Sequence, residues 1–217
     1  MTNSADRRIT VLLVDDHAVV REGYRRLLER DERLSVIGEA ASIDEALQID
    51  GAAKPAVTVL DIALPGVSGI EILRRLLARR PAARVLMFSM YQDGIYANHA
   101  MNAGARGYLS KASAPELLID AVRAVADGER FISPDVERAM HNQSATAQHL
   151  AQSLSARELE VLRLLAQGYG IDDIAVRLGL SPKTASNHQS SIKQKLGAGS
   201  ALQLMLIAHQ YGLIAGG

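Results

Sequence analysis

Between Ile9 and Gly128 the chain alternates short apolar runs with longer amphipathic segments, and this alternation restricts the fold more than any other feature. The apolar runs are ITVLLV, LSVIGEA, AVTVL, RVLMF and RGYL, at residues 9–14, 34–40, 56–60, 84–88 and 106–109. Helical patterns follow them near 17–30, 43–51, 68–79, 94–103 and 114–127. Strands that are apolar along their whole length are typical of a parallel sheet covered on both faces. We therefore predict a five-stranded, doubly wound α/β domain over residues 1–132.

The remainder of the chain has helical signals only, which predicts a second, small all-α domain over residues 153–217. Its first helix starts with a capping box made by Ser155 and Glu158. Three further helices are predicted over 171–178, 182–196 and about 200–211, the second of them with proline at its first position. The polar, alanine-rich residues 133–152 are interpreted as a linker with some helical character.

Composition narrows the protein class further. The sequence has no cysteine, which excludes disulfides and thiolate metal sites and fits a reducing cytoplasm. No apolar run approaches the roughly 18 residues of a membrane span, and the N-terminus does not resemble a secretory signal, so we expect a cytoplasmic protein without membrane contact. Residues 1–137 hold 17 basic and 20 acidic side chains, a net −3, while residues 138–217 hold 7 and 4, a net +3. The sign of this offset fits a C-terminal domain that meets a polyanion.

Carboxylates end two of the predicted strands. Asp15 and Asp16 follow the first strand in VLLVDDH, and Asp61 follows the third in TVLDIALPG. Because the carboxyl ends of parallel strands meet at one edge of the sheet, we expect the three acids in one crevice. Clustered carboxylates disfavour one another's ionisation, whereas a hard divalent cation with oxygen ligands removes that penalty. The sequence therefore predicts a Mg²⁺ site.

Two more polar residues follow neighbouring strands: Ser89 after RVLMF and Lys111 after GYLS. A hydroxyl and an ammonium beside a metal-bound carboxylate suit a phosphoryl group carried on that carboxylate. Taken singly, such residues have simpler roles, because a strand-end aspartate or serine usually caps a helix and a lysine is usually solvated. Their joint presence at successive strand ends favours the phosphoryl site.

Residues 9–130 resemble the receiver domain of bacterial two-component response regulators. The matching segments are VLLVDDH, LDIALPGVSGIEIL, LMFSM, GARGYLSK and GERFISP. The resemblance implies a flavodoxin-like, CheY-like fold and transfer of a phosphoryl group to Asp61 from a phosphohistidine of a sensor histidine kinase. By position it also implies these roles: Mg²⁺ ligands Asp16, Asp61, Asp15 (through water) and the backbone carbonyl of Ala63, phosphoryl contacts Ser89 and Lys111, and the aromatic switch Tyr108. For Tyr108, the alternative is a half-buried strand tyrosine with no switching role.

From Leu154 the chain resembles the LuxR-type helix-turn-helix of the NarL/FixJ regulators. The matching residues are Glu158, Gly168, Ile174-Ala175, Leu178-Gly179, Ser181, Lys183-Thr184, His188 and Lys195-Leu196-Gly197. The resemblance implies that the helix over 182–196 enters the major groove of promoter DNA. The candidate DNA contacts are Lys183, Thr184, Ser186, Asn187, Gln189, Ser190, Lys193 and Lys195. Among them the amides suit base edges and the lysines suit phosphates.

Three departures from that family weaken the expected phosphate contacts. Family members often have lysine where this chain has Asp172, Ser186 and Ser190. We therefore expect weak binding by a monomer and reliance on a homodimer. The last helix, SALQLMLIAHQY, is apolar on more than one face and is interpreted either as the dimer surface or as a packed terminal helix. His188 either packs beneath the motif or faces DNA.

Three functional hypotheses remain. The first is a response regulator, not an enzyme, in which phosphorylation of Asp61 by a sensor histidine kinase controls DNA binding and transcription, with RNA polymerase as a further candidate partner. The second is a regulator that binds DNA constitutively or whose output helices bind another protein. The third is a Mg²⁺-dependent phosphatase or phosphotransferase, which the helix-turn-helix segment disfavours.

Overall fold

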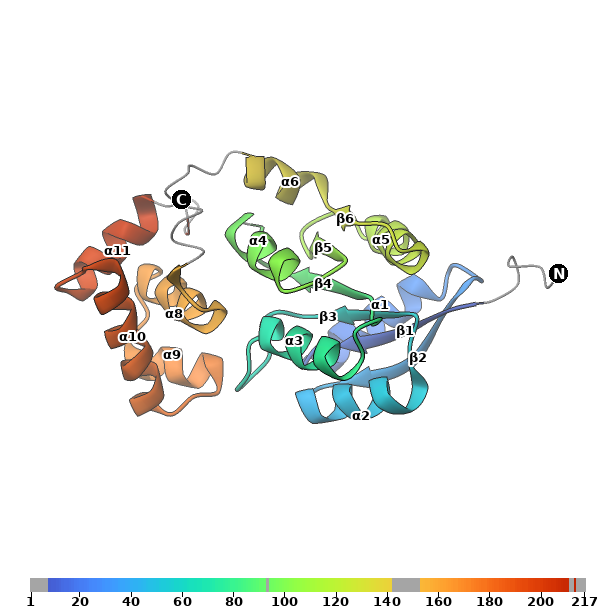
Figure 1. Ribbon diagram of the computed structural model, residues 1–217, viewed down its shortest axis with the longest axis horizontal. Coiled ribbons are helices and arrows are strands. Elements are labelled where there is room, and N and C mark those ends of the chain that lie inside the picture. The colour runs from blue at the N-terminus through green and yellow to red at the C-terminus, as the bar shows by residue number, and fades with distance from the viewer. Residues whose placement is uncertain (1–7, 93, 142–152, 211–212, 214–217) are drawn as a thin grey trace.

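A computed structural model describes residues 8–92, 94–141, 153–210 and 213 (Figure 1). The N-terminal part is a parallel sheet in the order β2-β1-β3-β4-β5-β6. The strands are β1 (Ile9–Val14), β2 (Leu34–Ala40), β3 (Val57–Leu60), β4 (Val85–Ser89), β5 (Gly107–Ser110) and β6 (Phe131–Ile132). The predicted α/β class and all five predicted strands are confirmed. The sixth strand was missed because two residues are too short to produce a periodic pattern.

Helices cover both faces of the sheet, as a doubly wound domain requires. They are α1 (Ala18–Leu28), α2 (Ile43–Ala53), α3 (Gly69–Arg79), α4 (Gly94–Asn102) and α5 (Glu116–Asp127). Alternate residues of β1 belong to two separate cores. Val11 and Leu13 pack with α1 and α5, whereas Leu12 and Val14 pack with α2, α3 and α4. This two-sided burial explains why the strands are apolar without alternation.

A further helix, α6 (Pro134–His141), lies within the segment predicted as a linker. It packs beside α4 (Figure 1). The side chain of Val136 is fully buried. Ser113 Oγ donates to Asp135 Oδ1 at 3.0 Å, which ties the start of α6 to the loop before α5. The predicted linker thus begins as an element of the receiver-like part, and its residues 142–152 lie outside the described residues.

The C-terminal part consists of α8 (Ala156–Ala166), α9 (Ile171–Leu178), α10 (Pro182–Leu196) and α11 (Ala201–Gln210). The predicted capping box is present: Ser155 Oγ accepts from Glu158 N, and the Glu158 carboxylate accepts from Ser155 N. Gly179 and Gly197 end α9 and α10 in the left-handed conformation that lacks a steric penalty only for glycine. The predicted bounds of α9 and α10 are confirmed, because both helices have local start and stop signals.

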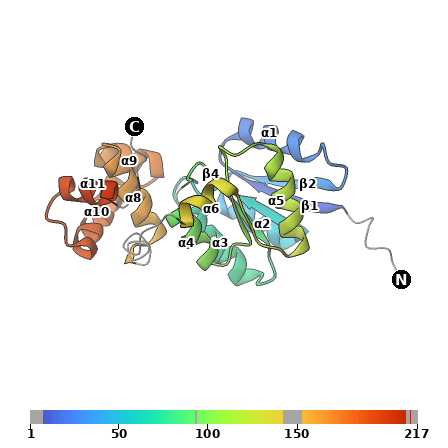
Figure 2. The ribbon, with the colours of Figure 1, turned by 90° about the horizontal axis from the view of Figure 1, so that it is seen from above.

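The two parts touch through α8 and α9, while α10 lies on the side away from the sheet (Figures 1 and 2). Gly66 N, in the loop between β3 and α3, donates to Leu178 O at 2.8 Å. The Arg163 guanidinium of α8 lies 4.3 Å from the centre of the Tyr91 ring. The apolar core on the α2–α4 side continues without a break into the C-terminal helices.

Gly69 provides a test of how closely α3 packs on the end of β3. A Cβ at Gly69 would stand 2.6 Å from Ile62 Cα and closer still to the Asp61 carbonyl, both backbone atoms. We expect Gly69→Ala to lower the free energy of unfolding by about 1–3 kcal/mol, the usual cost of overpacking. Gly51→Ala, within α2 and with no atom inside 4 Å, is the matched control and should stabilise by about 0.5–1 kcal/mol. Urea unfolding measures both, and a neutral Gly69→Ala would contradict this packing.

Candidate functional site

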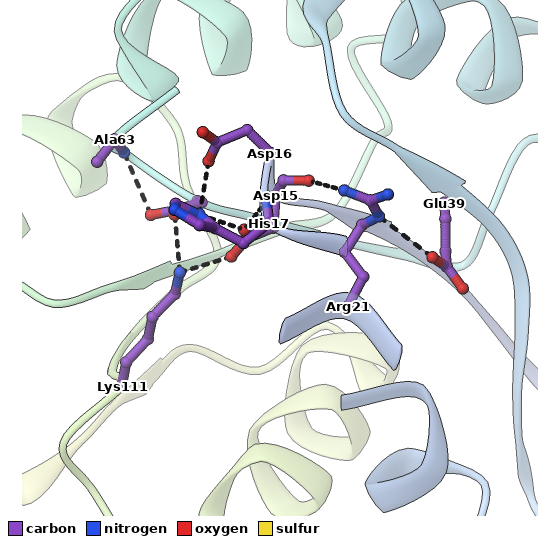
Figure 3. A network of polar contacts seen from close by, with 8 residues as sticks. Asp15, Asp16, His17, Arg21, Glu39, Ala63 and Lys111 are labelled. Atoms are coloured by element: carbon purple, nitrogen blue, oxygen red, sulfur yellow. Dashed lines mark hydrogen bonds and ion pairs between the residues drawn. The ribbon is translucent and has the colours of Figure 1, made fainter. Parts of the chain in front are cut away.

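The predicted acids meet at the carboxyl edge of the sheet, where Lys111 joins two of them. Lys111 Nζ donates to Asp15 Oδ2 at 2.6 Å and to Asp61 Oδ2 at 2.7 Å (Figure 3). All three side chains are less than a tenth exposed. Asp61 Oδ1 accepts from Ala63 N at 3.2 Å. The topology therefore brings together residues that are up to 96 positions apart.

Burial and the shared lysine set the charges of this cluster. Burial raises the pKa of Asp61, and the neighbouring Asp15 charge raises it further, against the opposing effect of Lys111. Burial also acts on Asp15, but hydrogen bonds from Lys111 and His17 bring its pKa below the ordinary value. The two carboxylates raise the pKa of Lys111 although burial opposes this, so the ammonium stays charged. One cation thus balances two buried carboxylates incompletely.

Asp16 supplies the third carboxylate of the site. Its Oδ1 is buried, and its neighbour His17 Nδ1, at 2.9 Å, pairs with it only when the imidazole is protonated. Ligand atoms of Asp15, Asp16 and His17 lie within 4.8 Å of one another. Carboxylate oxygens without hydrogen-bond donors are the ligands that hard divalent cations take. The donor set therefore fits a divalent cation.

The predicted hydroxyl and aromatic residues lie on the neighbouring strands. Ser89, at the end of β4, is fully buried and its Oγ accepts from Tyr91 N at 3.1 Å. Its backbone carbonyl accepts from Lys111 N at 2.7 Å, so both strand ends belong to one edge. Tyr108 of β5 is also fully buried, and its hydroxyl donates to Tyr91 O at 2.8 Å. Tyr91 therefore joins Ser89, Tyr108 and the output helix residue Arg163.

Sequence reasoning missed two charged residues behind the acids, Arg21 and Glu39. Arg21 Nη1 donates to Asp15 O at 2.5 Å and its Nε donates to Glu39 Oε2 at 3.1 Å (Figure 3). These residues stand 18 positions apart, on α1 and β2. No local pattern signals such a pair, because only the sheet order brings the two elements together.

The candidate DNA-binding residues lie on α10 and differ in exposure. Lys183, Ser186, Asn187 and Ser190 are exposed, and Thr184, Gln189 and Lys193 are partly exposed. Thr184 also belongs to the helix cap, since its backbone N donates to Ser181 Oγ. The buried face of α10 holds Ala185 and Ile192. His188 is partly buried, and burial lowers its pKa, with a contribution from the positive charge of Arg157.

Lys195, another candidate DNA contact, is engaged within the domain. Its Nζ donates to Glu158 Oε2 at 2.6 Å, and Ser191 Oγ donates to Glu158 Oε1 at 2.6 Å. Burial raises the pKa of Glu158, but hydrogen bonds from Lys195, Ser191 and Ser155 lower it to about 2. The carboxylate of α8 thereby fixes the orientation of α10.

Comparison with known proteins agrees with both halves of this geometry. The family described as "Response regulator receiver domain" matches residues 11–123, and "Bacterial regulatory proteins, luxR family" matches residues 152–208. The chain is a response regulator of the NarL/FixJ family. Members of this family are transcriptional regulators and not enzymes, so the phosphatase hypothesis is set aside.

Full-length relatives share this organisation. This response regulator is 34% identical over 209 residues to the response regulator GacA of Pseudomonas aeruginosa, covering 95% of this chain and 98% of GacA. It is 37% identical over 196 residues to the transcriptional regulatory protein UhpA of Escherichia coli, covering 90% and 95%. Among solved structures, RcsB of Salmonella enterica bound to the promoter rprA with the phosphomimetic BeF3⁻ is similar, with a TM-score of 0.66, 27% identity and coverage of 92% and 98%. None of the described helices is long and apolar enough to span a membrane.

The hydrogen bonds that Glu158 accepts from Ser155, Ser191 and Lys195 predict that the C-terminal output domain, α8 to α11, is sensitive to acid. The pKa of Glu158 in the folded domain is about 2, below the ordinary 4.5. The stability that the ionised Glu158 contributes to the fold is therefore complete above about pH 4.5 and disappears as the pH falls toward 2. We expect Lys195→Met to cost about 1 kcal/mol at pH 7, since Lys195 is 40% exposed, and the loss to shrink below pH 4.5. Urea unfolding at pH 7 and pH 4 measures this. Lys193→Met removes the same charge from the same helix without the contact, and an equal loss in both variants would contradict the role of Glu158.

Proposed function

We propose that Asp61 accepts a phosphoryl group from a phosphohistidine of a sensor histidine kinase, and that this modification controls binding of α10 to specific promoter DNA. The observation that carries the proposal is Lys111 Nζ between the buried carboxylates of Asp15 and Asp61. A buried lysine on an acceptor carboxylate is positioned to neutralise the oxygens of an incoming phosphoryl group.

The remaining residues of the site have separate tasks in this proposal. Asp15, Asp16, Asp61 and the backbone carbonyl of Ala63 would hold Mg²⁺, which supplies the charge neutralisation that phosphoryl transfer needs. The Ser89 hydroxyl turns from Tyr91 N toward the phosphoryl oxygens. Because Tyr91 O accepts from Tyr108, a movement of Ser89 disturbs both tyrosines. The acceptor site and the loop that holds Tyr91, between β4 and α4, therefore change conformation together.

The output side acts on double-stranded DNA in the cytoplasm, as a homodimer. The exposed face of α10 supplies Asn187 for base edges and Lys183 for phosphates. RcsB dimers have been solved on DNA, which supports the same arrangement here. On α11, Leu202 and Leu206 are 65% and 60% exposed, and these apolar side chains supply the dimer surface. RNA polymerase is proposed as the partner reached from the promoter.

Coupling between the two sites runs through the contact of α8 and α9 with the β3–α3 loop. Leu178 O accepts both from Gly66 N at 2.8 Å and from Arg157 Nη2 at 2.6 Å, and Arg157 Nη1 donates to the buried Glu160 at 2.6 Å. Burial raises the pKa of Glu160, and the charge of Asp61 raises it further. Phosphorylation replaces the Asp61 carboxylate, of charge −1 when ionised, by an acyl phosphate of roughly −1.5 to −2, and this added negative charge opposes Glu160 and loosens the contact.

One observation favours the second candidate, constitutive DNA binding. Ser186, Asn187 and Ser190 are exposed in the unphosphorylated chain, so the receiver part does not cover the predicted reading face. Regulation by phosphorylation then requires that the interdomain contact limits dimer geometry rather than access to α10.

Phosphorylation itself is tested by mass spectrometry of the full chain with Mg²⁺ and a small acyl phosphate. We expect the wild type to gain the mass of one phosphoryl group and Asp61→Asn to gain none, because Asp61 is the proposed acceptor, whereas Asp15, which is equally buried and also paired with Lys111, serves the cation in this proposal. Asp120→Asn, an exposed acid, is the control and should be modified like the wild type. Footprinting on genomic fragments with and without the donor then separates the two candidates. Identical footprints would favour constitutive binding, and an unmodified wild type would overturn the acceptor site.

The interdomain contact is tested with Arg163→Ala. Loss of the Arg163–Tyr91 contact, worth about 0.5–2 kcal/mol, should raise DNA affinity of the unphosphorylated chain severalfold. Arg177→Ala is matched, since Arg177 lies 4.0 Å over the Tyr169 ring inside the output domain. Loss of a cation alone weakens DNA binding, so only release from the receiver part predicts an increase. Gel-shift titration measures both variants, and an equal decrease in the two would contradict the coupling.

A further inference from the structure

Asp16 has the least side-chain support of the three acids, yet its position is fixed from both sides. His17 N donates to Asp15 Oδ1 at 2.8 Å, which holds the peptide group after Asp16. Arg21 Nη1 donates to Asp15 O at 2.5 Å, which holds the peptide group before it. Because each peptide group is planar, holding the Asp15 carbonyl also orients the Asp16 backbone N–H and the bond to its Cα. Arg21 therefore holds the backbone from which the Asp16 side chain projects.

Arg21 is itself held in place by a chain of charged residues. Its Nε donates to Glu39 Oε2 at 3.1 Å (Figure 3). Arg25 Nε donates to Glu39 Oε1 at 2.6 Å. Arg25 is anchored in turn on Val36 O at 3.0 Å. Burial raises the pKa of Glu39, but the two arginines bring it below the ordinary value, so the carboxylate is charged. The Arg21 side chain is only 14% exposed and lines a small pocket with Asp15, Asp61 and Tyr24.

We propose that Arg21, held by Glu39, is a positioning residue that fixes the Asp15–Asp16 peptide group and thereby prepares the acids for the divalent cation. This inference rests on the proposed cation site and adds a residue that touches neither the cation nor the phosphoryl group. Residues behind metal ligands that orient them typically change metal affinity by 10- to 100-fold when removed. The alternative is a structural ion pair that joins α1 to β2 and has no effect on the site.

The sign of the effect separates the two roles. Removing Arg21 makes the surroundings of the acids more negative, and Coulomb attraction alone would then strengthen binding of a divalent cation. A structural ion pair predicts lower stability with this small electrostatic gain. Positioning predicts the opposite, a loss of affinity, because the Asp16 carboxylate is no longer directed at the cation.

The experiment is an isothermal titration of the full, unphosphorylated chain with Mg²⁺ alone. We expect Arg21→Met to bind Mg²⁺ about tenfold more weakly than the wild type. Glu39→Gln should lose about threefold, and Arg21→Met/Glu39→Gln no more than Arg21→Met, since Glu39 acts through Arg21. Arg26→Met is the matched control: Arg26 is on the same helix and pairs with the exposed Glu22, away from the acids. Thermal melting without Mg²⁺ reports stability separately. Arg21→Lys, which keeps the charge but not the planar guanidinium that contacts both the Asp15 carbonyl and Glu39, should also bind Mg²⁺ more weakly and preserves the test should Arg21→Met fail to fold.

Each outcome decides one inference. Unchanged or tighter Mg²⁺ binding by Arg21→Met, with the wild type binding normally, overturns the role of Arg21 and leaves the proposed function intact. A loss of equal size in Arg26→Met also overturns it, because the effect would then not depend on the contacts that Arg21 makes with the Asp15 carbonyl and Glu39. If the wild type binds no Mg²⁺, the cation site of the proposed function fails, and the inference about Arg21 fails with it.

Discussion

The N-terminal part is organised around one unfavourable feature, the convergence of carboxylates at a buried sheet edge. Asp15 and Asp61 cannot both remain charged there without a cation, and Lys111 provides one that reaches both at 2.6 and 2.7 Å. A buried ion cluster contributes little net stability, because desolvation offsets most of the attraction. In the proposed function, its role is to hold Asp15 and Asp61 close together, where a divalent cation and a phosphoryl group would share their charge.

The same edge of the sheet carries the contact with the output helices. Asp61 and Gly66 belong to one loop, and Gly66 N donates to Leu178 O of α9. Tyr91 provides a second connection, since its backbone contacts Ser89 and Tyr108 while its ring meets Arg163. The phosphoryl group proposed on Asp61 would therefore act on the output domain over a short path. In this arrangement the acceptor site and the interdomain contact are neighbours rather than distant sites joined by a long relay.

A common device recurs at three places in the molecule. A buried or half-buried carboxylate accepts hydrogen bonds from cations on another element: Asp61 from Lys111, Glu39 from Arg21 and Arg25, and Glu158 from Lys195. Each pairing fixes the orientation of one functional element, namely the acceptor edge, the backbone of Asp15, and α10. Charged hydrogen bonds suit this task because they are short and directional.

The sequence by itself determined the two fold classes, the strand ends at which polar residues stand, and most element bounds. Apolar runs that end in Asp15, Asp61 and Lys111 were sufficient to predict one crevice, because parallel strands present their carboxyl ends at the same edge. Local caps such as Ser155 and Ser181 predicted where the output helices begin, because a cap acts within one turn of its own helix. Strand β6 escaped prediction because two residues are too short to produce a periodic pattern. Helix α6 was expected only as helical character within a linker, because its packing against α4 cannot be read from its own sequence.

Only the tertiary structure decided which partners these residues take. It placed Lys111 on Asp15 as well as Asp61, assigned Lys195 to Glu158, and brought Arg21 against Glu39 and the Asp15 carbonyl. It also placed α8 and α9 on the β3–α3 loop while α10 stayed outside. The physical reason is that such contacts join elements far apart in the chain. Hydrophobic periodicity and capping residues report on one element at a time, and so contain no information about what that element meets.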